Sequence, residues 1–574
     1  MMQKRFLFSS LILSGALLLS QAGFSSYAYQ QDNSTTSSEI IVDTNKSRLN
    51  NSTSTTVSSI AELETAIENG TSNITLQSGT YTLTKAISLK SNVTIDLNGS
   101  TLKSSTSSIF TTITQSVGGY DANQNIIIKN GTLVREGTIG VNLMTLGHAN
   151  TVTIENITFS NAHDGHMLEL GACKNVTIKN CTFKDGNYSN SNDDGEYEAL
   201  TFDVAHSGNF AIGPFDDYAC ENITVTGCTF SNVRRGVGAH RLLSGHLFTN
   251  IDINNCTFSN ITGTAIECIG FKDSTVDNNT LNNVFFGIDF MPPSKNIISS
   301  PGSYNANNTI SNNRITITQS SGKNPCGIRI TGINTTMLSG FNVSDNTVSG
   351  VYSYAVHAKY INASKIEMVT STNPKINGIR VENCDAVTVV GSTISKSKSH
   401  GLALINSKND VVDGNTINNS KAHGIYLQNA KNETLTNNTI IKAKKQGINL
   451  NKKSSCLLVG GNTIKRCKSN GINLEDKKSK ITTTYANKIT KPGQKTIAGK
   501  GKFFAVSNSI INLKKGKSVT IATFGMSGKV KYSSEDPSIA TVNSSGSVKG
   551  VSSGVTTIIA KRGKFYAKVK VTVK

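Results

Sequence analysis

Charged residues are scarce in this sequence, because Lys, Arg, Asp and Glu together make up only 16% of its 574 residues. Gly, Asn, Ser and Thr are frequent instead, and this composition argues against a helix bundle and favours β structure. The ten cysteines show no Cys-x-x-Cys spacing, and no His-rich run occurs. The spacings typical of zinc sites are therefore absent.

Long apolar runs are also missing, apart from one near the start. A basic pair precedes the apolar stretch Phe6–Leu19, which is too short to span a bilayer. Ser26–Ala28 then places small residues at both recognition positions of a signal peptidase site. The pattern predicts a signal peptide over residues 1–28 and a secreted protein without a transmembrane segment. The polar residues 29–57 are expected to form a disordered linker.

Acidic residues are rare in the C-terminal third. Residues 391–574 hold 33 Lys and Arg against 7 Asp and Glu, whereas residues 1–390 hold 24 against 30. So basic a surface predicts salt-sensitive attraction to an anionic cell-wall polymer or acidic glycan, and hence non-covalent retention at the bacterial cell surface. Nucleic acid is the other common polyanion, but the export signal and the scattered lysines argue against it.

The cysteines do not form the pattern of a disulfide framework. Cys181, Cys228 and Cys256 stand in the same phrase, as KNCTF, TGCTF and NNCTF. Cysteines that recur at the same position of a repeat are expected to stack as a column of small side chains inside a coil. Bridged neighbours are the alternative, but buried thiols that fill the core are the favoured interpretation.

A repeat dominates the middle of the chain. NGIRV, HGLAL, HGIYL, QGINL and NGINL place glycines at intervals of 23, 23, 23 and 24 residues. Short strands at this period, without an intervening helix, indicate turns of a parallel β-coil. Leucine-rich repeats share the period but need a leucine framework that is absent. At the start, Ser59 and Glu62 form a capping-box pattern, which predicts one helix ending at Gly70 that covers the open end of the coil.

Residues 58–500 resemble the pectate-lyase-like superfamily. The opening AELETAIENG…ITLQSGTYTLTKAISLKSNVTIDLNG and the many rungs of the Asn-x-Thr-Ile type carry the resemblance. It implies an all-β fold, a right-handed parallel β-helix. It says little about the reaction, because the superfamily includes lyases, hydrolases, epimerases, phage tailspikes and adhesins. Of the polygalacturonase motifs only an Asp216-Asp217 doublet occurs, in different surroundings.

Residues 504–574 form a different unit with alternating strands. The phrase SSEDPSIATVNSSGSVKGVSSG resembles the group 2 bacterial immunoglobulin-like domain. The resemblance implies a small β-sandwich that serves as a spacer or in surface attachment.

Aligning the repeats on the small residue before each strand gives columns that run along the stack. In Gly-Ile-Xaa-Val the aliphatic side chains point inward, so Xaa faces outward. We call the Xaa positions from Glu169 to Arg380 the charged column, since later members such as Ala403 and Asn449 carry no charge. Its members are, in order, Glu169, Thr201, Gly238, Glu267, Asp289, Arg329, His357 and Arg380.

Neighbouring rungs lie about 4.8 Å apart, so neighbours in a column interact. Glu267 and Asp289 would then be two carboxylates at about the separation used by retaining glycosidases, with one pKa raised so that it acts as an acid. In the next outward column, Asp203 and His240 would form a hydrogen-bonded pair. These four residues are the predicted catalytic set.

Long insertions flank the same rungs and predict walls beside the charged column. Residues expected to bind substrate are His166, Glu169, Glu198, Arg235, Arg329 and His357. No cofactor is assigned with certainty, and calcium is the one the sequence allows, with Asp216 and Asp217 as candidate ligands beside Glu198.

The sequence therefore predicts a secreted enzyme that cleaves a polysaccharide or glycan. Hydrolysis is favoured over elimination, because residues 1–390 are slightly acidic and a lyase must attract a uronate. The alternative is a non-catalytic surface adhesin or glycan-binding protein.

Overall fold

A computed structural model describes residues 53–113, 116–188, 197–239, 241–243, 245–290, 305–318, 324–334 and 337–574. The predicted signal peptide and almost all of the predicted linker lie outside these residues. Within the described ranges, no helix is long and apolar enough to cross a membrane.

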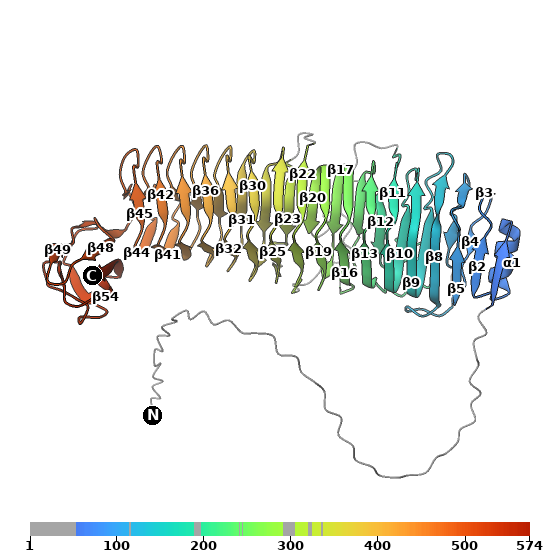
Figure 1. Cartoon of the computed structure of the whole chain (residues 1–574), viewed down its shortest axis with the longest axis horizontal. Coiled ribbons are helices and arrows are strands. Elements are labelled where there is room, and N and C mark those ends of the chain that lie inside the picture. The colour runs from blue at the N-terminus through green and yellow to red at the C-terminus, as the bar shows by residue number, and fades with distance from the viewer. Residues whose placement is uncertain are drawn as a thin grey trace, which may run out of the picture. The chain divides into compact units, whose positions relative to one another are not determined.

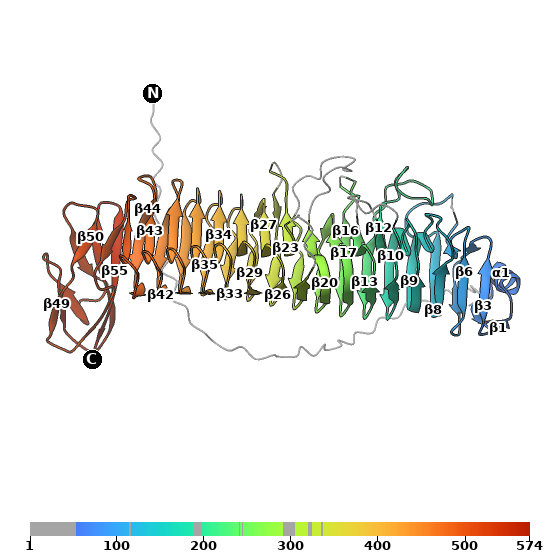
Figure 2. The ribbon, with the colours of Figure 1, turned by 90° about the horizontal axis from the view of Figure 1, so that it is seen from above.

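The described chain coils into rungs, and each rung contributes a strand to each of three parallel ladders (Figures 1 and 2). The site ladder contains β4 (Ile87–Ser88), β7 (Phe110–Thr111), β9 (Met144–Ser160), β10 (Leu168–Lys179), β12 (Glu198–Asp203), β15 (Arg235–Ala239), β17 (Thr257–Cys268), β20 (Thr280–Phe290), β23 (Cys326–Thr331), β27 (Tyr354–Lys359), β31 (Asn377–Glu382), β34 (Leu402–Ile405), β37 (Ile425–Gln428), β40 (Ile448–Asn451), β43 (Ile472–Leu474) and β46 (Ile497–Gly499).

The second ladder contains β1 (Ser54–Val57), β2 (Asn73–Leu76), β5 (Val93–Asp96), β8 (Asn123–Arg135), β9, β10, β13 (Glu221–Thr226), β16 (Phe248–Asn254), β18 (Phe271–Lys272), β19 (Thr275–Asp277), β21 (Thr309–Ser311), β25 (Asn342–Ser344), β29 (Lys365–Glu367), β32 (Thr388–Val390), β35 (Val411–Asp413), β38 (Glu433–Thr436), β41 (Ser455–Gly460) and β44 (Lys480–Tyr485).

The third ladder contains β3 (Thr80–Leu83), β6 (Thr101–Ser104), β8, β9, β11 (Thr182–Lys184), β14 (Thr229–Ser231), β17, β20, β22 (Arg314–Ile317), β26 (Thr347–Gly350), β30 (Thr370–Thr372), β33 (Thr393–Ser395), β36 (Thr416–Asn418), β39 (Thr439–Ile441), β42 (Thr463–Lys465) and β45 (Lys488–Thr490). β24 (Leu338–Ser339) and β28 (Ile361–Asn362) pair separately in a fourth, short ladder.

The strands alternate inward aliphatic and outward polar side chains, and the inward set forms one continuous core. Identical positions stack from rung to rung. The rings of Phe159, Phe183, Phe230 and Phe258, for example, follow each other with centroids 4.7 Å apart. All ten cysteines are free and buried, which confirms that they fill the core.

Helix α1 (Ile60–Glu68) lies at the N-terminal end of the stack, as expected (Figure 1). The Ser59 hydroxyl accepts from the Glu62 backbone N–H at 3.2 Å, and the Glu62 carboxylate accepts from the Ser58 N–H at 2.7 Å. Ordered structure begins before residue 58, the predicted start of the β-helix, because β1 (Ser54–Val57) pairs in parallel with β2. These four residues form the outermost strand of the second ladder, not part of a linker.

The C-terminal unit is a β-sandwich of β47 (Phe504–Val506), β48 (Ile510–Leu513), β49 (Ser518–Thr520), β50 (Thr523–Gly525), β51 (Lys531–Ser534), β52 (Ala540–Val542), β53 (Ser547–Gly550), β54 (Gly554–Arg562) and β55 (Phe565–Val573), with its own core. Strand β55 also pairs in parallel with β44. The open edge of the second ladder at this end is thereby covered.

Candidate functional site

The charged column forms in the predicted register. Parallel pairing sets Glu169 opposite Thr201, and the column continues through Gly238 to Glu267. Glu267 then stands opposite Asp289. The remaining members, Arg329, His357 and Arg380, follow on successive strands. The side chains on either side of each member belong to the core, so the column faces outward.

Glu267 lies in a buried ion-pair cluster centred on Arg235. The guanidinium Nη1 of Arg235 donates to Glu198 Oε1 at 2.8 Å and lies 2.6 Å from Glu267 Oε2. Glu198 is fully buried and Glu267 is 6% exposed. Burial alone would lower the pKa of Arg235, but the two carboxylates outweigh it and hold that pKa above its usual range. Arg235 therefore contacts both carboxylates, and its single positive charge is shared between them.

Asp289, in the next rung, has its own arginine. Both Arg329 Nε, at 2.9 Å, and Arg329 Nη2 donate to the Asp289 carboxylate, a bidentate arrangement. The guanidinium also lies 4.4 Å from the centre of the Phe286 ring. Glu267 and Asp289 thus stand in adjacent rungs as predicted, but each is held by a cation. The expected mutual repulsion that would make one of them an acid is offset.

Glu169 is the buried acid of the charged column whose pKa is raised towards neutral pH. Its Oε2 accepts from the Asn142 amide at 2.6 Å and from the Thr145 hydroxyl at 3.3 Å. Burial, followed by the charge of Asp203, raises the pKa of Glu169 to about 7. Asp203 is 1% exposed and sits one rung on, opposite Gly171.

His166 links this pair to the arginine cluster. Its backbone N–H donates to the Asn142 side-chain oxygen at 2.8 Å, and its ring Nδ1 lies 2.8 Å from the Glu198 carbonyl oxygen. His240, the predicted partner of Asp203, lies outside the described residues. One network therefore contains six of the predicted site residues, namely His166, Glu169, Glu198, Asp203, Arg235 and Glu267.

A loop formed by residues 204–219 covers the first rungs of the column. Phe210 and Ile212 pack with Ala172 and Ala205. A Cβ added to Gly171 would lie 2.5 Å from the Phe210 ring, so a glycine is needed beneath the loop.

The aspartates of this loop hold it in place. Asp216 accepts from the Gly119 N–H at 2.6 Å, and Asp217 Oδ1 lies 2.5 Å from His206 Nδ1. Among the described residues, no group of three or more His, Cys, Asp or Glu is placed to hold a metal ion. Asp216 and Asp217 are accounted for as loop anchors, each with a partner inside the fold.

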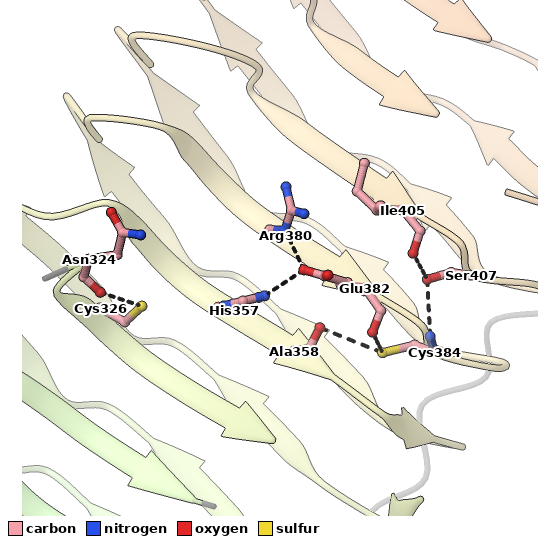
Figure 3. A network of polar contacts seen from close by, with 9 residues as sticks. All are labelled: Asn324, Cys326, His357, Ala358, Arg380, Glu382, Cys384, Ile405 and Ser407. Atoms are coloured by element: carbon pink, nitrogen blue, oxygen red, sulfur yellow. Dashed lines mark hydrogen bonds and ion pairs between the residues drawn. The ribbon is translucent and has the colours of Figure 1, made fainter. Parts of the chain in front are cut away.

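His357 belongs to a second, smaller cluster (Figure 3). Glu382 accepts from His357 Nε2 at 3.2 Å and from Arg380 Nε at 2.7 Å. The hydrogen bond with His357 and the ion pair with Arg380 lower the pKa of Glu382 to about 2, against the opposing effect of burial. Burial also lowers the pKa of His357. Sequence reasoning missed Glu382, although it lies in register with Lys359 in the second outward column.

An aromatic stack follows where the charged column ends. The rings of His400 and Tyr426 are 4.2 Å apart at 11°, and His423 stacks against both. Each histidine directly precedes a rung glycine, and both stack on Tyr426 of the site-ladder strand β37. The recurrence of an aromatic side chain before successive rung glycines was the signal for this stack.

Comparisons with known proteins agree with the fold. Residues 326–489 match the family model of the right-handed β-helix region, and residues 502–573 match that of the bacterial Ig-like domain (group 2). No curated protein matches the sequence.

Three solved structures illustrate the similarity. The surface protein and adhesin PfbA of Streptococcus pneumoniae is 18% identical over 76% of this chain and 95% of its own, with a TM-score of 0.35. The tailspike of E. coli bacteriophage HK620, in complex with a pentasaccharide, is 13% identical over 90% and 89%, with a TM-score of 0.41. The periplasmic alginate epimerase AlgG, as a double mutant, is 13% identical over 64% and 77%, with a TM-score of 0.34. At these values the likenesses carry no argument about substrate or reaction.

Proposed function

We propose that this chain, which joins a right-handed parallel β-helix to a group 2 bacterial immunoglobulin-like domain, is a secreted carbohydrate-active enzyme that hydrolyses a polysaccharide or glycan. The observation that carries the proposal is the pair Glu169–Asp203. Both carboxyl groups are buried on adjacent strands of the site ladder, and burial together with the charge of Asp203 raises the pKa of Glu169 to about 7. Glycoside hydrolysis needs these two groups, an acid for the leaving oxygen and a carboxylate to act on water or the sugar.

The roles follow from the environments of the side chains. Glu169 donates its proton to the glycosidic oxygen, and Asp203 is the base or nucleophile. Glu267 contacts the Arg235 guanidinium and Asp289 contacts that of Arg329, so we assign them to hydrogen bonds with sugar hydroxyls and not to proton donation. The proposal thus moves the acid from the pair Glu267–Asp289 to Glu169.

A non-catalytic surface adhesin or glycan-binding protein is the second candidate. It is favoured by the low exposure of the carboxylates, since Glu169, Asp203, Glu267 and Asp289 are all at most 6% exposed. In that case the ion pairs would brace the rungs and the loops above them would bind the glycan.

The test is turnover by the signal-free protein on a panel of neutral and acidic polysaccharides. New reducing ends and the ultraviolet absorbance of unsaturated uronides are followed together. Glu169→Gln should lower kcat by about 100-fold or more, because a positioned general acid contributes roughly that factor. Glu155→Gln, an acid paired with Lys179 on another face, is the matched control and should keep full activity.

The pH profile supplies a second readout. Since Glu169 acts in its protonated form, activity should fall as pH rises through about 7. Full activity in Glu169→Gln would disprove its role. Absorbance without dependence on Glu169 would indicate a lyase and direct attention to the arginines. Retention on one glycan without any turnover would favour the adhesin.

A further inference from the structure

A row of lysines follows the corner between the third ladder and the site ladder in the C-terminal rungs. Backbone hydrogen bonds fix the register of this corner, for example Ser399 N–H to Ile376 O at 3.0 Å and Ala422 N–H to Ser399 O at 2.9 Å. Five successive rungs carry a lysine one residue before these positions. We call this row the lysine stripe, and it consists of Lys375, Lys398, Lys421, Lys444 and Lys468.

All five side chains are exposed, and none has an acidic partner within salt-bridge distance among the described residues. The surrounding corner is uniformly basic. The six corner segments 370–378, 393–401, 416–424, 439–447, 463–471 and 488–496 contain thirteen Lys and Arg and no Asp or Glu. No local counter-charge therefore neutralises the stripe.

The geometry of the rungs makes this arrangement unfavourable by itself. Successive rungs are about 4.8 Å apart, and like charges on directly opposed residues of paired strands repel. Lys408, at the opposite corner, is relieved by an ion pair with Asp385 at 3.2 Å. Among the described residues the stripe has no such ion pair, and a linear polyanion laid along the stack would provide the missing counter-charge.

We propose that the lysine stripe binds an extended acidic polysaccharide with one carboxylate on each sugar, aligned with the axis of the β-helix. A polyuronate offers a negative charge once per sugar, and one sugar is similar in length to the rung spacing of about 4.8 Å. The stripe begins in the rung of Arg380, where the charged column ends. A polymer held there would continue onto the face that carries the column.

This inference does not depend on catalysis. The stripe is a binding surface separate from Glu169 and Asp203, and it holds for either candidate function. Binding would be mainly electrostatic, so affinity should fall steeply with salt.

The test is the affinity of the full mature chain for de-esterified polygalacturonate, measured over a series of salt concentrations. Changing all five stripe lysines to Gln should weaken binding by about 10-fold or more and reduce the slope of log affinity against log salt. The matched control changes Lys514, Lys515, Lys549, Lys564 and Lys570 to Gln. These five are exposed on the immunoglobulin-like unit, and they lower the net charge equally. The control should lose less than about 3-fold.

Three outcomes overturn the proposal. Equal losses in the two variants would show that net charge, not the stripe, attracts the polymer. Equal affinity for polygalacturonate with half of its carboxylates esterified would exclude the match in spacing. Equal stripe-dependent affinity for single-stranded DNA or polyphosphate would show a general polyanion surface. Circular dichroism and thermal melting verify that both variants are folded, and neither variant changes the proposed catalytic pair.

Discussion

Opposed Xaa positions of the site ladder are between 22 and 40 residues apart in sequence from β10 to β27, but only 23 to 25 apart from β31 to β46. In the first region the extra residues form loops, and the outward face of the site ladder carries buried carboxylates paired with arginines. The second region has uniform rungs, a site-ladder face without charged residues at the Xaa position after Arg380, and exposed lysines at one corner. The contrast shows that the solenoid alone needs only the regular rung, so the insertions of the first region and the charges on its outward face call for another explanation.

The largest expected effect is in the irregular region. Arg235→Met removes the cation shared by Glu198 and Glu267, both buried. Breaking a buried ion pair from one side costs about 3–5 kcal/mol, so the chemical-denaturation midpoint should fall sharply. Arg314→Met, at an exposed position of β22, is the control and should change stability by less than about 0.5 kcal/mol. Similar values for the two variants would mean that the cluster contributes nothing to the fold.

A clash in the regular region should come next. A Cβ on Gly424 would lie 2.4 Å from Ile440 Cγ2 and 2.7 Å from the Gly447 carbonyl oxygen. Gly424→Val should therefore destabilise the solenoid by about 3 kcal/mol, because both neighbours belong to the core. In the irregular region, the three atoms nearest to a Cβ on Gly171 are ring atoms of the Phe210 side chain, and none of them belongs to the backbone. Gly171→Val should therefore destabilise the protein by only about 1 kcal/mol. Thermal melting of the two variants measures the difference between a clash inside a regular rung and a clash with a loop side chain.

Two carboxyl groups are buried inside the regular rungs, and they make stability depend on pH. Burial raises the pKa of Asp410 to about 7, and burial with the charge of Asp410 raises the pKa of Glu433 to about 9. Glu433 Oε2 accepts from the Asp410 N–H at 2.7 Å. The pKa values of these two groups are near 4 in the unfolded chain and higher in the folded protein. Their contribution to the free energy of unfolding is therefore fully present below about pH 4 and is lost as pH rises through the folded pKa values.

Glu433→Gln should remove part of this dependence. The variant should be more stable than the parent at pH 8, by about 2 kcal/mol, and equal to it at pH 4. Melting temperatures of the parent and the variant, measured from pH 4 to pH 9, test this expectation. A parallel pair of curves, with no convergence at low pH, would contradict the raised pKa.

The parts predicted from the sequence are those that repetition determines. Parallel rungs force equal positions to stack, so the glycine period located the ladders and placed Glu267 opposite Asp289 without a structure. The counter-ions were missed because Arg235 and Glu198 stand three residues before the column and reach it only through side-chain conformation. The raised pKa of Glu169 was missed for the same kind of reason, since it depends on burial beneath a loop whose path no repeat defines.

The smallest expected effect concerns the outward asparagine ladders that mark the turns. Asn175 has φ +55°, donates from Nδ2 to Asn150 Oδ1 at 2.9 Å and accepts from Asn222 Nδ2 at 3.0 Å. Asn175→Ala loses both bonds and retains a backbone that disfavours alanine, a cost of about 1 kcal/mol. Asn175→Gly loses the same bonds but tolerates the backbone, so it should recover about half of that cost. Chemical denaturation of the two variants separates the contributions. If the glycine variant is no more stable than the alanine variant, the hydrogen bonds of the asparagine ladder provide the stability. If both variants are as stable as the parent, the ladder does not contribute to stability.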